Sequence, residues 1–265
     1  ERADPSAAQW EEARWENKLN SLPHERMQFY YGDAPSAECL AATLQPGTSL
    51  VASGYILYSS STFFALTLGA GVQIFTLDIS IGEFVLTHPC VEIPKRGKIY
   101  SCNEANRPYW DKPLQDYFEG LSTGTGESKT QYTSRYIGSM VGDVHRTLLY
   151  GAIYGYPADA KNPDGKLRLL YEAAPMAYLI EQAGGLALTG KTRIMDLIPQ
   201  NVHQRVPGLI GSPDDVRAVL AASRRARART YYKAVAVVGG RYLAIFDLSL
   251  IHIAEPTRRR GRSYG

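Results

Sequence analysis

The sequence predicts a layered α/β fold, and three observations between residues 47 and 220 support this prediction. Runs rich in β-branched and aromatic residues come first, apolar residues at helical spacing follow, and strand-like and helix-like runs then alternate. Gly, Pro, Asn and Asp gather between these runs, as expected of turns and caps. A chain of this kind is expected to stack helices on sheets around a hydrophobic core.

The strands come first. Five runs are expected to be strands of one sheet: LVASGYILY, FFALTL, VQIFTLDI, GEFVLTH and GKIYS. Gly69, Ala70 and Gly71 separate the second run from the third, and this spacing predicts a hairpin. The later run SMVGDVHRTLLYGAIYGY has helical spacing, and Tyr156-Pro157 is predicted to end that helix.

A turn, a strand and two helices complete the pattern. The turn signal Asn162-Pro163-Asp164-Gly165 leads into the predicted strand KLRLLY. The run AAPMAYLIEQAGG is then predicted to be a helix that stops at its two glycines through a left-handed C-cap. A final helix is expected in SPDDVRAVL, with Ser212 as its N-cap.

Charge and pattern divide the chain into three regions. Residues 1–43 contain AAQWEEARWENKLNSL, which predicts an exposed helix, and residues 44–220 carry the α/β pattern. Residues 221–265 have a net charge of +8, against −5 for the rest of the chain. The arginines of this basic tail lack interleaved aromatic residues, so we expect no nucleic-acid binding. Two apolar runs in the tail have the composition of strands, but at least LSLIHIAEPTRRRGRSYG is expected to be non-native and is excluded from the fold.

The composition also excludes several classes of protein. No apolar run reaches the roughly 18 residues that a membrane span needs, and the N-terminus lacks the order of a signal peptide. The three cysteines, Cys39, Cys90 and Cys102, show no paired metal spacing, which favours reduced thiols in the cytoplasm. The histidines have no zinc-ligand spacing. The string Gly-x-Ser-x-Gly occurs at residues 120–124 and 261–265, but neither copy joins a predicted strand to a predicted helix, as a catalytic serine of this type requires. We therefore expect no membrane partner, no zinc chemistry and no serine catalysis.

Glu172 follows a predicted strand and precedes a predicted helix, a position at which open α/β sheets bind ligands. A carboxylate there can share a divalent cation with a phosphate group. Lys166 and Arg168 are two residues apart, so in a strand their side chains share one face. Such cations, with nearby tyrosine and asparagine side chains, would suit a phosphorylated sugar. Composition alone favours a simpler interpretation, in which the cations form a solvated strand face and Glu172 is a favourable charge at a helix start.

A set of long strings in a fixed order carries more information than any single motif. The run RYIGSMVGDVHRTLLYGAIYGYPADAKNPDGKLRLLYEAAPMAYLIEQAGG follows LDISIGEFVLTHP and GKIYSCNEANRPYW, and IPQNVHQR and GSPDDV come after it. In this order the strings resemble the C-terminal half of class I fructose-1,6-bisphosphatase, over about residues 44–220. The resemblance implies a layered α/β/α sugar-phosphatase fold of which this chain lacks the N-terminal half.

The same resemblance implies an activity and a set of site residues. The family is a Mg²⁺-dependent phosphoric monoester hydrolase of gluconeogenesis and the Calvin cycle, which converts fructose 1,6-bisphosphate to fructose 6-phosphate and forms a homotetramer. Six residues match positions that bind the sugar and its 6-phosphate: Asn103, Arg135, Tyr136, Met140, Tyr156 and Lys166. Arg135 matches an arginine that reaches the 6-phosphate site of a neighbouring subunit. Glu172 matches a metal-ligand carboxylate.

The chain departs from the family in one respect that concerns catalysis. The family's other metal ligands lie around an Asp-Pro-Leu-Asp-Gly-Ser motif and a preceding pair of glutamates, and this sequence contains neither. Because Glu172 alone cannot hold two or three ions, we expect a catalytically incomplete chain in which no catalytic residue is identified. The alternative is a non-catalytic module that binds sugar phosphate or pairs with other subunits, and the alternative to the cytoplasm is the plastid. His145 and Arg146 are interpreted as structural or interface residues.

Overall fold

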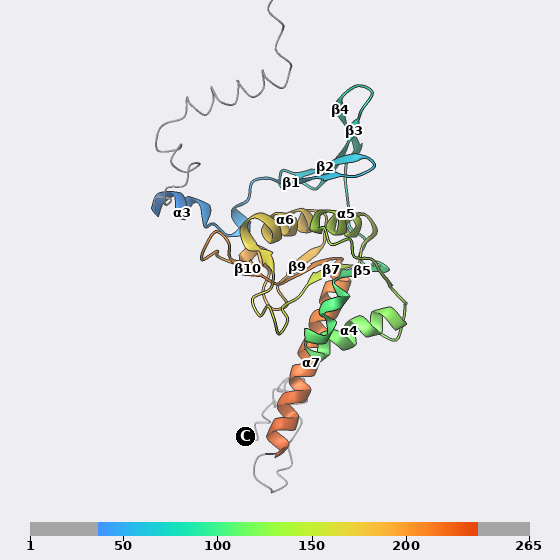
Figure 1. Cartoon of the computed structure of the whole chain (residues 1–265), viewed down its shortest axis with the longest axis vertical. Helices are drawn as coiled ribbons and strands as arrows, with labels where there is room; N and C mark the ends of the chain where they lie inside the picture. The colour runs from blue at the N-terminus through green and yellow to red at the C-terminus, as the bar shows by residue number, and fades with distance from the viewer. Residues whose placement is uncertain (1–36, 238–265) are drawn as a thin grey trace, which may run out of the picture.

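The computed structural model describes residues 37–237, which form two main sheets separated by a pair of helices, and one separate two-stranded pair (Figure 1). Helices α5 (Met140–Tyr150) and α6 (Ala174–Gln182) lie between the sheets. Helices α4 (Lys112–Thr123) and α7 (Pro213–Val237) cover the other side of the second sheet. The layered α/β fold predicted from the sequence is confirmed in this outline, because sheets and helices alternate through the molecule.

The first sheet is an antiparallel meander in the order β1-β2-β3-β4. Its strands are β1 (Ser53–Tyr58), β2 (Thr62–Thr67), β3 (Gln73–Asp78) and β4 (Glu83–His88), and α3 (Ala37–Thr43) and the short turn η1 (Gly47–Ser49) precede them. One face of the sheet packs on α5 and α6 and buries Tyr55, Ala65 and Ile74. The hairpin predicted at Gly69-Ala70-Gly71 is confirmed, since it joins β2 to β3 and both glycines have positive φ, 87° and 85°.

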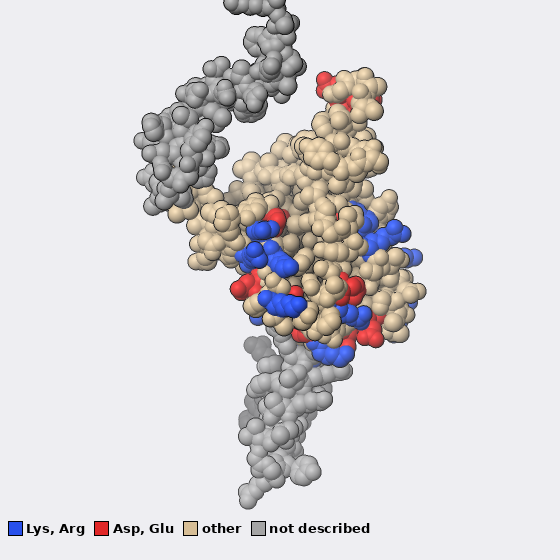
Figure 2. Space-filling view, viewed as in Figure 1, with Lys and Arg blue, Asp and Glu red and all other residues tan. Residues whose placement is uncertain are grey.

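The outer face of the first sheet is apolar and uncovered within the described part of the chain. Cross-strand register places Phe64, Phe75 and Leu86 side by side on this face. Phe84 and Leu86 of β4 are 40% and 47% exposed. Figure 2 shows a surface without visible Lys or Arg over these strands, and the sequence from residue 51 to 94 contains neither residue type. A face of this kind favours contact with other apolar surfaces.

The second sheet has the order β6-β5-β7-β11-β9. Its strands are β5 (Ile99–Cys102), β6 (Thr133–Ser134), β7 (Ile153–Tyr156), β9 (Leu186–Leu188) and β11 (Gly208–Gly211). Strand β5 is parallel to both β6 and β7, whereas β11 is antiparallel to β7 and β9. A separate pair joins β8 (Leu167–Arg168) to β10 (Arg205–Val206), and the remaining short elements are η2 (Glu104–Tyr109), η3 (Leu169–Ala173) and η4 (Ile194–Asp196).

Two hydrophobic cores lie on the two sides of the second sheet. The larger one is between the sheets, where Leu148 of α5 and Ile180 of α6 are fully buried. The smaller one lies under α4 and α7, and Phe118 and Leu121 are its main α4 side chains. None of the helices in residues 37–237 is long and apolar enough to cross a membrane.

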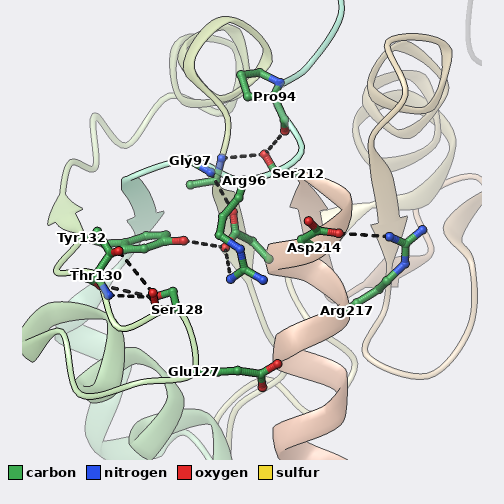
Figure 3. A network of polar contacts seen from close by, with 12 residues as sticks. Pro94, Arg96, Gly97, Glu127, Ser128, Thr130, Tyr132, Ser212, Asp214 and Arg217 are labelled. Atoms are coloured by element: carbon green, nitrogen blue, oxygen red, sulfur yellow. Dashed lines mark hydrogen bonds and ion pairs between the residues drawn. The ribbon is translucent and has the colours of Figure 1, made fainter.

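The sequence predicts a cap at the end of α6 and another at the start of α7. The C-cap predicted after α6 is confirmed, because Gly184 has φ of 86° and the Gly185 amide bonds the Ile180 carbonyl. Ser212 does precede α7, but its hydroxyl does not cap that helix. The Ser212 hydroxyl instead donates to the Pro94 carbonyl at 2.6 Å and accepts from the Ala152 amide at 2.8 Å (Figure 3).

Three predicted elements differ from the structure. The helix expected to run to Tyr156 ends at Tyr150, because Gly151 and Ala152 have positive φ and the next four residues pair as β7. The run GKIYS belongs to the second sheet, because it pairs with β7. Only Leu167 and Arg168 of the predicted strand KLRLLY are extended, since the chain then enters the π-helical turn η3. In the first two cases long-range strand pairing outweighs the local pattern.

The remaining predictions concern the two ends of the chain. The helix predicted at AAQWEEARWENKLNSL and the non-native stretch predicted at LSLIHIAEPTRRRGRSYG lie outside the described residues. Helix α7 continues through residue 220 to Val237, so the start of the basic tail is helical where its first apolar run had suggested a strand. The division of the chain at residues 43 and 220 stays a prediction.

Candidate functional site

A pocket with a volume of about 510 Å³ opens beside the second sheet and α5. Five of the seven site residues predicted from the sequence line it, namely Tyr136, Met140, Tyr156, Lys166 and Glu172. The pocket is also lined by Gly138, Tyr154, Leu167, Arg168 and Arg205. The structure therefore brings most of the predicted site together from segments far apart in the sequence.

Parallel pairing of β6, β5 and β7 explains how these segments meet. Tyr100 of β5 is the register partner of both Ser134 in β6 and Ile153 in β7, so the three strands end at the same edge. Residues at the carboxyl ends of parallel strands gather at one edge of a sheet, where ligands bind in many α/β proteins. Tyr136 follows β6 by two residues, and Tyr156 is the last residue of β7. The sheet topology thus delivers both tyrosines to the pocket.

Asn103 and Arg135 come to the same edge but do not line the pocket. Asn103 directly follows β5, and its side-chain oxygen accepts a hydrogen bond from the Ala105 amide at 3.2 Å, which caps η2. The Arg135 amide donates to the Tyr100 carbonyl at 2.9 Å and thereby continues the parallel pairing beyond β6. Both residues are neighbours of the pocket, and the side chain of Arg135 is exposed.

Met140 is the first residue of α5, and its side chain packs against the larger core. The segment before it turns at Gly138, which has φ of 86°. Tyr136, in the same segment, is 36% exposed. Burial raises the pKa of Tyr136, and Tyr156 nearby adds to the effect, so its hydroxyl stays protonated at neutral pH and can donate a hydrogen bond.

Lys166 reaches the pocket through the predicted turn at residues 162–165. Gly165 ends this turn with φ of 75°, and a Cβ atom on it would lie 2.2 Å from the Pro207 nitrogen, so the close approach requires glycine. The Lys166 ammonium lies 5.9 Å from the centre of the Tyr156 ring. An ammonium beside a phenol ring and hydroxyl combines a cation with a hydrogen-bond donor on one side of the pocket.

Glu172 lies in η3, one turn before α6, close to where the sequence places a helix start. One of its carboxylate oxygens accepts from the Arg168 amide at 2.7 Å, and the other pairs with the Arg168 guanidinium at 3.2 Å. This pairing orients the carboxylate. It also makes Arg168 and Glu172 one ion pair, so Lys166 and Arg205 are the cations that remain for an anionic ligand.

Among the polar side chains that line the pocket, those of Arg205 and Tyr154 were missed by sequence reasoning. Arg205 is the register partner of Arg168 in the β10–β8 pair, which places the two arginines beside each other. Tyr154, two residues before Tyr156 in β7, is buried, and burial raises its pKa. The alternation of side chains along β7 places both tyrosines on the same face, which was the available signal for Tyr154. Arg205 had no local signal, because its place depends on pairing across 37 residues of sequence from position 168.

The residues that line this pocket do not fit a complete Mg²⁺ site. Magnesium is bound through carboxylates and substrate phosphates, and a two-ion site needs several carboxylates. Glu172 is the one acidic residue that lines the pocket, and both of its oxygens already accept hydrogen bonds. Within residues 37–237, no group of three or more His, Cys, Asp or Glu side chains is arranged to hold a metal ion.

Comparison with known protein families gives two matches, which cover different parts of the chain. The family described as "Fructose-1-6-bisphosphatase, C-terminal domain" matches residues 93–224. The family described as "Fructose-1-6-bisphosphatase, N-terminal domain" matches residues 29–89. The prediction that the N-terminal half is missing is therefore wrong for this second segment, which includes the first sheet.

Individual relatives agree with these matches. The chain is 54% identical over 187 residues to chloroplastic fructose-1,6-bisphosphatase of Oryza sativa subsp. indica. The matched residues make up 71% of this chain and 46% of that protein. It is 54% identical over 176 residues to the cytosolic fructose-1,6-bisphosphatase of Solanum tuberosum, covering 66% of this chain and 52% of that protein. The chain thus spans about half the length of the curated relatives that it matches.

A solved structure supports the fold. The crystal structure of Leishmania major fructose-1,6-bisphosphatase in holo form superposes with a TM-score of 0.66 and 49% sequence identity. The match covers 70% of this chain and 56% of that one. Sequence strings, fold and both family matches agree, and the chain belongs to the fructose-1,6-bisphosphatase family, with parts of both its N-terminal and C-terminal domains.

Proposed function

We propose that this chain forms the sugar-phosphate-binding part of a fructose-1,6-bisphosphatase active site. The observation that carries the proposal is the meeting of Tyr136, Tyr156 and Lys166 in one pocket through the parallel strands β6, β5 and β7. Lys166 and Arg205 supply charge for the 6-phosphate, and the tyrosine hydroxyls supply donors for phosphate and sugar oxygens. The family's activity is the hydrolysis of the 1-phosphate of fructose 1,6-bisphosphate to fructose 6-phosphate.

Asn103, Arg135 and Met140 have supporting places in this proposal. Asn103 and Arg135 lie beside the pocket at the edge of the sheet, and Met140 fixes the start of α5 against the core. The exposed Arg135 side chain is available to a neighbouring subunit, as in a homotetramer of the family type. The residues of one subunit would then complete the 6-phosphate site of the next.

The hydrolytic step needs more than this chain's described residues supply. Divalent metal, Mg²⁺ in our proposal, provides activation of water and charge stabilisation in enzymes of this class. Glu172 is placed to give one carboxylate, and the remaining ligands are absent from residues 37–237. Binding of sugar phosphate, rather than turnover, is therefore the function that the described pocket supports best.

Calorimetric titration of the purified chain with fructose 6-phosphate tests this proposal. We expect saturable binding that is lost in Lys166→Ala and weakened in Tyr156→Phe. The matched control is Lys112→Ala, which removes an exposed lysine on α4 that does not line the pocket. Equal binding by the wild-type chain and Lys166→Ala would contradict the proposal.

Phosphate release from fructose 1,6-bisphosphate with and without Mg²⁺ tests completeness of the site. The expected result is binding without release, in both the wild-type chain and Glu172→Gln. Mg²⁺-dependent release that Glu172→Gln abolishes would show instead that the chain assembles a full metal site.

The alternative function is a non-catalytic module that pairs with other subunits. The uncovered apolar face of the first sheet favours it, because an exposed patch of this type marks interaction surfaces. Binding to other subunits with no affinity for fructose 6-phosphate would support this alternative.

The cytoplasm is the proposed compartment and the plastid the alternative, since the relatives carry cytosolic and chloroplastic names. Imaging of a fluorescent fusion would separate the two.

A further inference from the structure

Asp143 is a fully buried acid on the first turn of α5, next to the candidate pocket. Its carboxylate accepts hydrogen bonds from the amide of Ile137, at 3.1 Å to each oxygen, and from the amide of Gly138 at 3.3 Å. These amides belong to the segment that carries Tyr136 into the pocket. A buried side chain therefore fixes the backbone on the C-terminal side of Tyr136.

Arg146 holds the same segment from the other side. One terminal nitrogen of its guanidinium donates to the Arg135 carbonyl at 2.6 Å and to the Ser101 hydroxyl at 2.7 Å, and it also contacts Asp143. The side chain is 16% exposed, so these bonds form away from most of the solvent. Arg146 thus ties the backbone just before Tyr136 to strand β5, where Ser101 lies.

We infer that Asp143 and Arg146 are positioning residues for the sugar-phosphate site. They hold residues 135–138 in one conformation, and that conformation sets the places of the Tyr136 hydroxyl and of Arg135. Charged hydrogen bonds to backbone groups are short and strong when solvent is excluded, which suits them to this purpose. A preformed segment spares the ligand the free-energy cost of ordering it.

The inference deepens the proposed function and rests on it, since it assigns roles toward the same ligand. It also agrees with the structural alternative that the sequence left open for Arg146. The Arg146 guanidinium contacts three groups of its own chain. Asp143 carried no sequence signal beyond an acid in the first turn of a helix.

The chain offers a matched control for Asp143. Asp215 on α7 is also fully buried, and it also accepts from a loop amide, that of Gly97 at 3.0 Å, and pairs with an arginine, Arg96. The Tyr132 hydroxyl is a third partner at 2.8 Å (Figure 3). This cluster lies under α4 and α7, on the opposite side of the second sheet from α5.

The experiment compares Asp143→Asn with Asp215→Asn in two measurements. The first is the dissociation constant of fructose 6-phosphate, and the second is amide hydrogen exchange of residues 135–138 without ligand. We expect Asp143→Asn to weaken binding about tenfold, which corresponds to the loss of one or two hydrogen bonds, and to speed exchange at Ile137 and Gly138. Asp215→Asn is expected to lower stability while leaving the affinity within about twofold.

A second variant, at Arg146, tests the inference independently of Asp143. Arg146→Lys retains the charge, but the lysine ammonium lies one bond nearer the backbone than the terminal nitrogen that makes all three contacts of Arg146. We therefore expect it to speed exchange of the segment and weaken binding even where Asp143→Asn does not fold. Faster exchange at Ile137 and Gly138 with unchanged affinity in the variants would overturn the positioning role. An equal loss of affinity in Asp215→Asn would overturn it as well, as a general effect of stability. Absence of binding by the wild-type chain would instead refute the proposed function on which it rests.

Discussion

The Sγ atom of Cys102 in β5 occupies the space that a side chain on Gly155 in β7 would need. A Cβ atom on Gly155 would lie 2.5 Å from this sulfur, well inside van der Waals contact. The two residues are register partners in the parallel pair that brings the candidate site together. The thiol is buried, and burial raises its pKa, so it acts here as a small apolar group.

We therefore expect Gly155→Ala to destabilise the chain by about 1–3 kcal/mol, as overpacking in a core does. Cys102→Ala should rescue it, because it removes the atom that clashes. Urea unfolding of the two single variants and the double variant gives the coupling free energy. Additive effects of the two substitutions would show that the clash is relieved in some other way.

His145 on α5 gives the fold a dependence on pH. Its Nδ1 atom and the Tyr55 hydroxyl are 2.8 Å apart in the core, and burial lowers the pKa of His145, with the nearby His88 adding to the shift. The unfolded chain, with a histidine pKa of about 6.5, then binds more protons than the folded one just below that pH. Stability is complete above this pKa and is lost as the pH falls through it.

The measurement is urea unfolding at a series of pH values from about 7.5 to 5.5, the range in which histidine titrates. The free energy of unfolding should fall toward acid pH in the wild-type chain and fall less steeply in His145→Gln. The Tyr55→Phe variant should keep the slope, because the histidine is still buried. A slope that His145→Gln leaves unchanged would assign the dependence to other groups.

Ser212 connects three segments at the start of α7. Its hydroxyl is buried and bonds both the Pro94 carbonyl and the Ala152 amide. Ser212→Ala leaves that amide without its hydroxyl partner, which costs about 1–3 kcal/mol of stability. The control is Ser59→Ala, which removes an exposed hydroxyl from the β1–β2 turn and should change stability by less than about 0.5 kcal/mol. Thermal unfolding compares the stability of the two variants, and equal unfolding midpoints would contradict this expectation.

The apolar face of the first sheet should make the purified chain self-associate. Phe84 lies on the edge strand β4, and its ring centroid is 6.0 Å from that of Phe64 in β2. Phe84→Lys places a charge there and is expected to reduce association, whereas Thr125→Lys adds the same charge at an exposed loop site and should not. Light scattering after size-exclusion chromatography measures both. A well-folded wild-type monomer would be inconsistent with this expectation.

Features set by neighbouring residues could be predicted from the sequence, and features set by long-range pairing could not. The hairpin at Gly69-Ala70-Gly71 and the cap at Gly184 depend on backbone conformations that favour glycine, so composition is sufficient to find them. The end of α5 at Tyr150 depends on pairing of the following residues with β5, and apolar spacing carries no signal of such pairing.

The same distinction applies to the site. Resemblance to the family supplied Tyr136, Tyr156 and Lys166, and the structure places all three in one pocket. Asp143 and Arg205 were missed, because their roles depend on hydrogen bonds and register that only the folded chain defines. Asn103 and Arg135 lie at the correct edge of the sheet but outside the pocket lining, and residue spacing in a sequence does not distinguish the two positions.

The π-helical turn η3 determines the direction of the pocket's carboxylate. The Ala174 amide bonds the Leu169 carbonyl five residues back, one residue more than in an α-helix. Because each residue of an α-helix turns by about 100°, removing one residue here would rotate everything before it by that angle relative to α6. Glu172 lies within this wider turn, and its ion-pair partner Arg168 directly precedes the turn. Deletion of Leu170 is therefore expected to turn Lys166 and Arg168 away from Glu172, although the chain would keep every side chain that lines the pocket.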